Sequence, residues 1–448
     1  PVRIEFPLDD SKRPLDVVFE DRATMRFDLA ADESEGAAGA EVGLRRALFR
    51  LDGRLAPLPE PGLVRVEGEA SLVDLDGWVD VIVDEVMQGS GMGGLELEPG
   101  LLFAQEALFL DRLFTDVEME FSVEGPEFQA VFRSEDLDGS VRYRDSDGSG
   151  NLSAEFNRLV LGDPVSSGLS MENDPAELPA LHLYARSLSY AGIELGETRI
   201  EAYPKASGFH FEKVDTSSDS LSVQASGDWS LGPEGARSDF SINMASESLG
   251  DFLHSMDISS SMQGGQTLVK FDAWWPGTPG AFALSRLNGK VEFSVVDGNI
   301  ANASAGTGRL LGLLSVQAIP KRLSLDFRDV FDSGFSFDEA RGTFEMKNGI
   351  ARTDDVELNS SAATISVRGE TDLVEQRYDQ ELTIKPGLGN TLPIIGALAG
   401  GPVGAATGLA LQGLLHKEIA EASQVRYSIT GSWDDPKFEP VEVERAGG

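Results

Sequence analysis

A period of two dominates the apolar pattern of this 448-residue chain. From about Gly289 onward, segments such as Val291–Val295 and Leu382–Ile384 alternate apolar with polar residues, which is the period of a β-strand with one buried face. Turn sequences separate these segments, and Lys347–Gly349 (KNG) predicts a type I′ hairpin. A sheet of such strands must cover its apolar face with helices, with a second sheet, or with something other than protein.

Helical patterns are too few to supply that cover. Apolar residues recur at helical spacing in residues 74–87 and again in residues 247–257, which predicts two short amphipathic helices. Residues 309–319 could form a third. The sequence therefore predicts a mainly β protein with a few short helices.

Residues 386–415 carry no charge, in a chain whose formal net charge is −38. About 20 apolar residues in a helix would cross a bilayer, but Pro402 and eight glycines interrupt this stretch and favour two short helices over one rod. We therefore expect an apolar helical hairpin over residues 386–416, either buried at the end of a core or dipping into a membrane. The candidate membrane contacts are Leu392, Ile394, Ile395, Leu398, Val403, Leu409, Leu411 and Leu414.

Composition excludes several classes of function. Acidic residues outnumber basic ones 75 to 37, and such an excess repels phosphate backbones, so we expect no nucleic-acid partner. The absence of cysteine rules out disulfides, thiolate metal sites and cysteine nucleophiles. The four histidines are scattered singly, and no phosphate-binding glycine loop is present. We therefore expect no cofactor, no catalytic residues and no enzymatic activity.

One string resembles a calcium loop. Asp145, Asp147 and Ser149 have the spacing of the first ligands of an EF-hand, but Phe156 stands where the bidentate glutamate belongs. A tight hairpin between strands 141–144 and 151–156 explains the same residues through turn chemistry. Calcium is the weaker of these two interpretations.

The chain is long enough for two or more domains. Residues 162–180 are rich in proline, serine and acidic residues and form the best candidate linker. The expected order is a β unit over 1–161 with the helix near 74–87, the linker 162–180, a second β unit over 181–300 with the helix near 247–257, and a C-terminal β unit over 301–448 with the hairpin 386–416. Because the sequence opens at Pro1 without a visible signal peptide, we expect a processed or excised part of a longer protein.

A family resemblance adds to this pattern. Gly308–Phe327 (GRLLGLLSVQAIPKRLSLDF) resembles the C-terminal region of YhdP-like members of the AsmA-like envelope proteins of Gram-negative bacteria. The likeness continues through Gly342–Gly349 (GTFEMKNG) and Ala397–Gly404 (ALAGGPVG), and it ends at Gly431–Pro436 (GSWDDP). Specific motifs are limited to roughly the last 150 residues. The earlier part resembles the family only in its general pattern of antiparallel meanders and short helices.

The resemblance implies a bridge-like lipid carrier. Such proteins form an elongated, twisted antiparallel β-sheet groove, taco-like, with an apolar inside and a polar outside. The expected role is passage of phospholipids between the inner and outer membranes across the periplasm. An N-terminal anchor, absent from this chain, would attach the protein to the inner membrane. The C-terminal hairpin would contact the outer membrane. The alternative is an envelope scaffold or outer-membrane assembly factor that carries no lipid.

The apolar positions of the last strands are the candidate lipid contacts. Acyl chains could cover the face that the helices leave bare, so no catalytic chemistry is required. The predicted groove residues are Val291, Phe293, Val295, Leu323, Leu325, Phe327, Phe344, Met346, Val356, Leu358, Ile365, Val367, Leu382 and Ile384.

Overall fold

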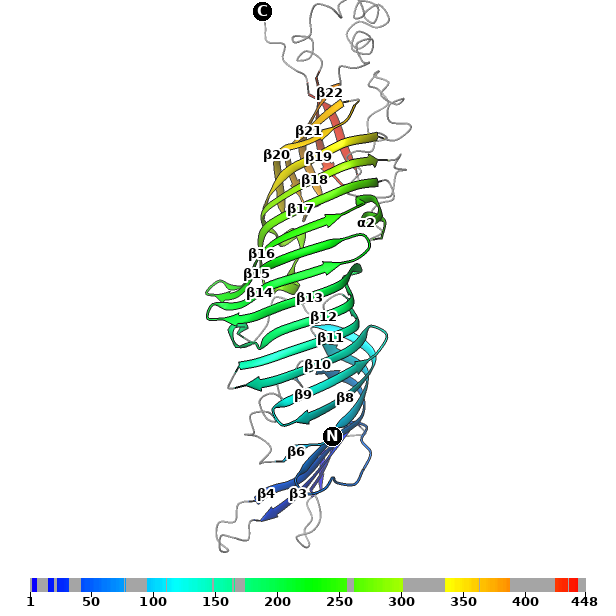
Figure 1. The fold of residues 1–448 in the computed structure, drawn as a ribbon, viewed down its shortest axis with the longest axis vertical. Coiled ribbons are helices and arrows are strands. Elements are labelled where there is room, and N and C mark those ends of the chain that lie inside the picture. Colours follow the sequence, from blue (N-terminus) through cyan, green and yellow to red (C-terminus); the bar gives the residue numbers. More distant parts are fainter. Residues whose placement is uncertain are drawn as a thin grey trace, which may run out of the picture. The chain divides into compact units, whose positions relative to one another are not determined.

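The described residues of the computed structural model are mainly β: their 24 strands form one mixed sheet, and the helices among them are few and short (Figure 1). It divides into two compact units, Pro1–Val214 and Asp215–Gly448. This division is coarser than the four segments expected from the sequence, which remain a prediction. The structure describes residues 2–5, 15–19, 22–31, 42–75, 77, 95–109, 111–146, 149–162, 165, 174–255, 262–300, 335–361, 363–386, 424–433 and 435–441.

The first unit holds the strands up to β14, within which the division falls. Its elements are β1 Val2–Glu5, β2 Leu15–Phe19, β3 Ala23–Ala31, β4 Val42–Arg50, β5 Leu63–Asp74, β6 Glu96–Leu97, β7 Gly100–Phe109, β8 Arg112–Glu124, β9 Glu127–Arg133, β10 Leu137–Ser146, β11 Ser149–Leu161, η2 Pro175–Glu177, β12 Ala180–Tyr190, β13 Ile193–Lys205 and β14 Gly208–Ser217.

The sheet is mixed, so the prediction of a purely antiparallel sheet was wrong. β5 pairs in parallel with β4, β6 and β7, and β11 pairs in parallel with β12. Parallel neighbours need a crossover connection, which a hairpin cannot provide. Residues 162–179, most of the expected linker, are the connection between β11 and β12. The remaining pairs described in this unit are antiparallel.

Strand β5 changes partners at Gly68. Its first half pairs with β4 and its second half with β7. Gly68 has φ +122°, and a Cβ placed there would lie 2.9 Å from the backbone nitrogen of Leu51. Only glycine fits this backbone conformation and this close approach.

The second unit is an antiparallel series in which each strand pairs with the next in the chain. Its elements are β15 Ser222–Gly232, β16 Gly235–Ser246, α2 Leu249–Ser255, β17 Met262–Pro276, η3 Pro279–Ala281, η4 Leu284–Arg286, β18 Asn288–Ile300, β19 Phe335–Lys347, β20 Ile350–Asn359, β21 Ala363–Asp372, β22 Arg377–Pro386, β23 Val425–Ser432 and β24 Pro436–Pro440.

Two local predictions for this unit, a hairpin and a helix, can be compared with the structure. Lys347 pairs with Ile350, and Asn348 and Gly349 between them have φ of 50° and 80°, which confirms the type I′ hairpin. Helix α2 lies inside the predicted range 247–257. Of residues 74–87, where a helix is expected, only Asp74, Leu75 and Gly77 are described: Asp74 ends β5, and Leu75 and Gly77 are helical. Residues 309–319 and all but the first residue of 386–416 lie outside the described residues.

The two ends of the strands in the second unit carry different connections. We name the end that holds α2 the α2 rim and the opposite end the hairpin rim. The turns between β19 and β20, β21 and β22, and β23 and β24 lie at the hairpin rim and are short. The connections from β16 to β17, from β18 to β19 and from β22 to β23 all leave from the α2 rim. Within the described ranges, no helix is long and apolar enough to cross a membrane.

Candidate functional site: one apolar face in each unit

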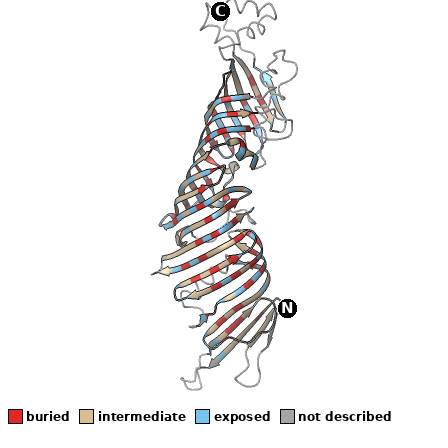
Figure 2. Cartoon of the chain, turned by 45° about the vertical axis from the view of Figure 1, so that its right-hand side comes forward, coloured by how far each residue is buried: buried red, intermediate tan, exposed pale blue. Residues whose placement is uncertain are grey.

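Each unit gathers its apolar side chains on one face of the sheet. Figure 2 shows buried and exposed positions alternating along the strands, as a one-sided sheet requires. In the first unit, one cross-strand row of this apolar face runs through Phe121, Ala130, Val141, Ala154 and Leu183 on β8 to β12. The first four of these are buried, and the row belongs to a single hydrophobic cluster whose buried and partly buried members extend from β3 to β13.

The sheet of the first unit curls around this face. The guanidinium carbon of Arg112, at the start of β8, lies 5.7 Å from the ring centre of Tyr190, at the end of β12. Three strands separate β8 from β12 in the pairing order. In a flat sheet four steps of about 4.8 Å would place the two backbones roughly 19 Å apart. The contact between these side chains, together with the curved ribbon of β8 to β12 in Figure 1, indicates that the sheet bends toward its apolar face at this end.

The second unit places the predicted groove residues on one face. Val295, Ala340, Leu358, Ile365 and Ile384 form one cross-strand row on five neighbouring strands. Shorter rows on the same face join Val291 to Phe344, and Val356 to Val367 and Leu382. The register places every described predicted groove residue on this face. One cluster contains Val291, Phe344 and Met346, and another contains Phe293, Val295, Leu358, Ile365, Leu382 and Ile384. Leu323, Leu325 and Phe327 lie outside the described residues.

Many of these side chains are only half-buried. Phe293, Phe344, Val367, Leu382 and Ile384 all retain solvent exposure. The rings of Phe293 and Phe344 stack with centroids 5.8 Å apart. Large side chains that stay partly exposed on the inner face of a sheet leave hydrocarbon surface available for contact with an apolar ligand.

Helix α2 covers the apolar face at the α2 rim. Its Leu249 and Leu253 pack against a cluster that contains Met262, Val295 and Leu358. The helix approaches β17 closely because Gly250 has no side chain: a Cβ there would lie 2.5 Å from the carbonyl oxygen of Met262. The hairpin rim is filled by a separate cluster around Trp275, Leu287 and Met346.

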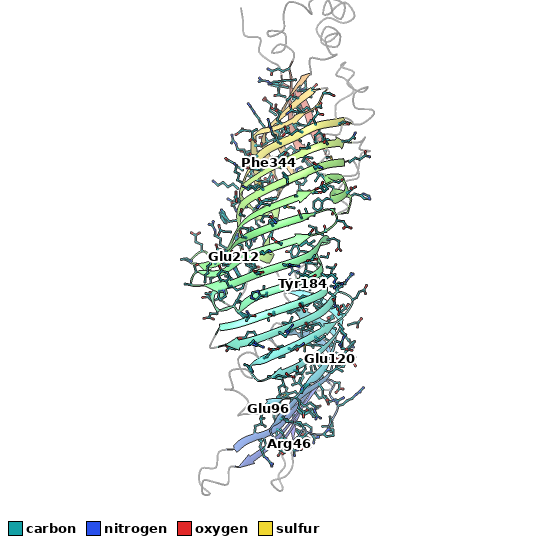
Figure 3. All side chains as sticks on the ribbon, viewed as in Figure 1. Arg46, Glu96, Glu120, Tyr184, Glu212 and Phe344 are labelled. Carbon is teal, nitrogen blue, oxygen red and sulfur yellow. The ribbon has the colours of Figure 1, made fainter. Side chains whose placement is uncertain are left out.

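The opposite face carries charge. A row through Glu120, Val131, Ser140, Glu155 and Tyr184 crosses β8 to β12 of the first unit, and Figure 3 labels its two ends. Arg133 on this face forms ion pairs of 2.8 Å with Glu118 and 2.7 Å with Glu120. These hydrogen bonds, the one to Glu120 first, raise the pKa of Arg133. The two faces of the first unit thus differ in polarity.

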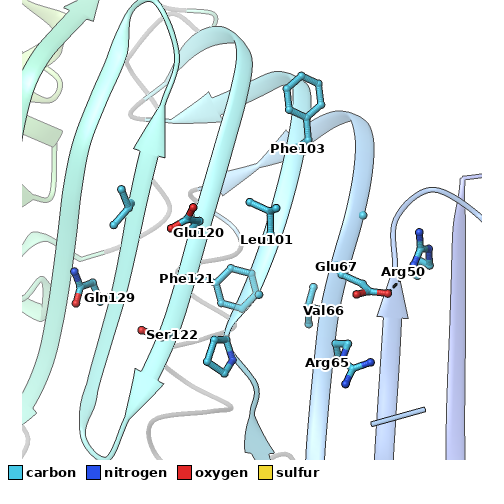
Figure 4. A pocket seen from close by; sticks show the side chains of 14 residues that line it. Arg50, Arg65, Val66, Glu67, Leu101, Phe103, Glu120, Phe121, Ser122 and Gln129 are labelled. Atoms are coloured by element: carbon cyan, nitrogen blue, oxygen red, sulfur yellow. Dashed lines mark hydrogen bonds and ion pairs between the residues drawn. The ribbon is translucent and has the colours of Figure 1, made fainter. Parts of the chain in front are cut away.

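A hollow of about 840 Å³ opens on this charged face of the first unit (Figure 4). Leu101 and Phe103 line it and are 51% and 36% exposed. The basic groups in its wall are paired, Arg50 with Glu67 at 2.6 Å and Arg65 with Glu98 at 2.6 Å. Both arginines of the described lining are thus held in ion pairs with carboxylates.

The calcium-like string forms a hairpin. Asp145 pairs with Gly150, and Ser146 pairs with Ser149 across the β10–β11 turn, so the turn interpretation is confirmed. Asp147 is not described, so the described residues do not test the weaker calcium interpretation. The described part of the chain has no group of three or more His, Asp or Glu side chains that could hold a metal ion.

Comparison with known proteins places the chain in a family. The family model described as "YhdP protein" matches residues 1–438. The chain belongs to the YhdP protein family. A curated relative, the "Intermembrane phospholipid transporter YhdP" of Escherichia coli K12, is 29% identical over 220 residues, which are 49% of this chain and 17% of that protein. The matched stretch is thus a small part of the relative's length. No solved structure matches the chain.

The family match and the fold together show what sequence reasoning missed. The family extends over both units, whereas specific motifs were recognised only in roughly the last 150 residues. No residue of the first unit was assigned to the apolar face, although Phe128, Ala130 and Phe132 alternate cleanly on β9 and are all buried. That alternation was the signal that could have identified the face.

Proposed function

We propose that the chain holds phospholipid acyl chains against the apolar faces of its two units and so forms part of a groove for lipid passage. The observation that carries this proposal is the set of half-buried apolar side chains on one face of the second unit. The first unit likewise has a buried apolar face opposite a charged one. Each CH₂ group shielded from water contributes about 0.8 kcal/mol, so hydrocarbon alone supplies the affinity. The curl at Arg112 and Tyr190 supports a trough rather than a flat surface.

The proposal extends to location. The relative's name describes a phospholipid transporter between membranes, and we infer a periplasmic segment that acts between the inner and outer membranes of a Gram-negative envelope. The uncharged residues 386–416 are the proposed contact with the outer membrane. Their described neighbours, Ile384 and Val425, pair at the α2 rim, where the other long connections also begin.

Photo-crosslinking tests the apolar face directly. A benzophenone amino acid in place of Phe293 or Leu382 should capture phospholipid from cells about tenfold more than one in place of Ser294 or Thr383, because adjacent residues point to opposite faces. The adducts are identified by mass spectrometry. Equal capture at both members of each pair would contradict the face assignment, and no capture at any position would favour the scaffold alternative.

A buried charge provides a second test. Leu382→Glu should reduce phospholipid co-purification about tenfold or more, because an unpaired carboxylate is costly to bring into contact with hydrocarbon. The matched control is Thr383→Glu on the opposite face. If Leu382 instead packs against protein throughout, the Glu variant unfolds, which circular dichroism would reveal.

A further inference from the structure

The apolar face of the second unit contains a buried polar patch. Thr353 on β20, Thr371 on β21 and Gln380 on β22 lie on this face and are 2%, 7% and 6% exposed. The register joins Thr353 to Gly369 and Gly369 to Gln380 across neighbouring strands. We name Thr353, Thr371 and Gln380 the polar station. It lies toward the hairpin rim, whereas the apolar residues Leu358, Ile365 and Ile384 lie toward the α2 rim on the same strands.

The hydrogen bonds of the station are incomplete within the described residues. The Nε2 group of Gln380 donates to the hydroxyl of Thr371 at 2.7 Å, while the buried Oε1 of Gln380 has no partner. The indole Nε1 of Trp433 is also buried without a partner. Trp433 stacks on Tyr378 at 6.1 Å and packs against the cluster that contains Ile429, the cross-strand neighbour of Gln380.

The side-chain amide of Gln380 and the indole of Trp433 can each donate a hydrogen bond to an acceptor atom of a ligand. If the amide of Gln380 turns by half a rotation, its oxygen accepts from the Thr371 hydroxyl and its nitrogen becomes free to donate. Together with the indole of Trp433 this makes two N–H donors beside an apolar surface. Buried polar groups normally find partners, so the arrangement fits a ligand that brings hydrogen-bond acceptors on an apolar body.

The lack of cationic side chains on the described part of this face decides which acceptor groups fit it. The described residues of β20 to β23 that share this face include no lysine or arginine. A phosphate group would therefore meet no cation here, whereas an uncharged carbonyl oxygen needs none. The ester carbonyls of a diacyl glycerophospholipid meet this description, since they join the acyl chains to the polar part of the molecule.

We propose that the polar station binds the glycerol-ester carbonyls of a diacyl phospholipid, through Gln380 and Trp433, and thereby fixes the lipid's position on the apolar face. This inference rests on the proposed lipid-carrying function. The acyl chains extend toward Leu358, Ile365 and Ile384, and Trp433 must move from its stack on Tyr378 as the ester enters. The station is a positioning site, because hydrocarbon burial supplies most of the affinity.

A comparison of ester and ether lipids tests the station. Dioleoyl phosphatidylglycerol and its diether analogue differ in the two carbonyls and share their hydrocarbon tails and headgroup. In competition, read by native mass spectrometry, the wild-type protein should bind the diester about tenfold more tightly, which is the effect of roughly one hydrogen bond. Thr371→Val and Gln380→Leu combined with Trp433→Phe, which removes both proposed donors, should bind both lipids equally while keeping its affinity for the diether lipid.

The controls separate the station from the proposed function. Replacing both hydrogen-bonding partners by apolar groups of similar shape leaves folding intact, which the melting temperature checks, and Thr383→Val on the opposite face should retain the wild-type preference. Equal binding of the two lipids by the wild-type protein would overturn the station and leave the lipid groove standing. Failure of both lipids to bind, together with absent crosslinks at Phe293, would overturn the proposed function itself.

Discussion

Tyr378 shows, at the scale of single residues, what the apolar face does to a titrating group. Burial raises the pKa of its phenol to about 12 from 10.0, and burial also raises the pKa of Tyr427 on the neighbouring strand. Between these values the folded chain keeps a proton that the unfolded chain has lost, so folding becomes less favourable as pH rises. The contribution is complete below about pH 10 and disappears through about pH 12.

Replacing this phenol should therefore flatten the alkaline limb of the stability curve. Tyr378→Phe should show a smaller fall in the urea midpoint between pH 9 and pH 11.5, roughly the range spanned by ordinary and raised tyrosine pKa values, than the wild-type protein shows. Tyr427→Phe should change the slope in the same direction. If both variants follow the wild-type slope, neither phenol is buried as the structure places it.

Residue patterns predicted the apolar face but not the polar station within it. The alternation through Leu358, Ile365 and Leu382 identified their common face because strand period alone decides it. Gln380 keeps the parity of Leu382, whereas Thr353 reaches the same face only through the bulge between Thr353 and Val356, which reverses the parity relative to Leu358. A polar residue at either position interrupts the apolar alternation, so the alternation does not assign it to the face. Only the cross-strand register, which joins residues from different hairpins, brings them together.

Hairpin turns at the scale of elements offer a matched pair of glycines. Gly192 and Gly349 each hold the second position of a two-residue turn, with φ of 81° and 80°. A Cβ on Gly192 would meet open space, whereas one on Gly349 would lie 2.7 Å from the carbonyl oxygen of Ser285 and 2.6 Å from Val374. The two positions share backbone strain and differ in packing.

Alanine at these positions separates the two effects. Gly192→Ala should cost about 1–2 kcal/mol, the strain of a left-handed residue, and Gly349→Ala should cost clearly more because the backbone at Ser285 cannot move aside easily. The loss of unfolded-state freedom is common to both and cancels in the comparison. Thermal unfolding measures the difference, and equal losses would show that the contact at Ser285 carries no energy.

The strands and turns of the second unit were predictable because each pairs with its neighbour in the chain. The parallel pairs of the first unit were not, since β4 with β5 and β11 with β12 depend on crossovers whose geometry lies outside any local window. The turn at Asn348 and Gly349 is encoded in two residues. The change of paired strand at Gly68 depends on the close approach of the Leu51 backbone, and a single glycine in the sequence does not predict it.

Taken as a whole, the molecule combines two apolar faces with a strongly acidic chain. The family match over residues 1–438 covers both units, so both faces belong to one family pattern. Sequence reasoning could name that family only from the last part, because strand alternation repeats across many folds while the motifs near Gly342 and Trp433 are specific. An excess of carboxylates opposes adsorption to anionic headgroups, so any membrane contact must come from an uncharged segment.

Residues 386–416 are that segment in our proposal, and their removal should separate membrane contact from the sheet. Because Ile384 and Val425 already pair, a short Gly-Ser bridge in place of Leu392–Leu414 should close β22 to β23 and leave the β signal in circular dichroism unchanged. Liposome binding should fall about tenfold or more, since transfer of the apolar residues into the bilayer supplies the attraction. Leu398→Asp with Leu411→Asp in the full chain should weaken binding in the same direction. A deletion protein that still binds liposomes and transfers lipid at the wild-type rate would place the membrane contact elsewhere and reduce the hairpin to a structural cap on the α2 rim.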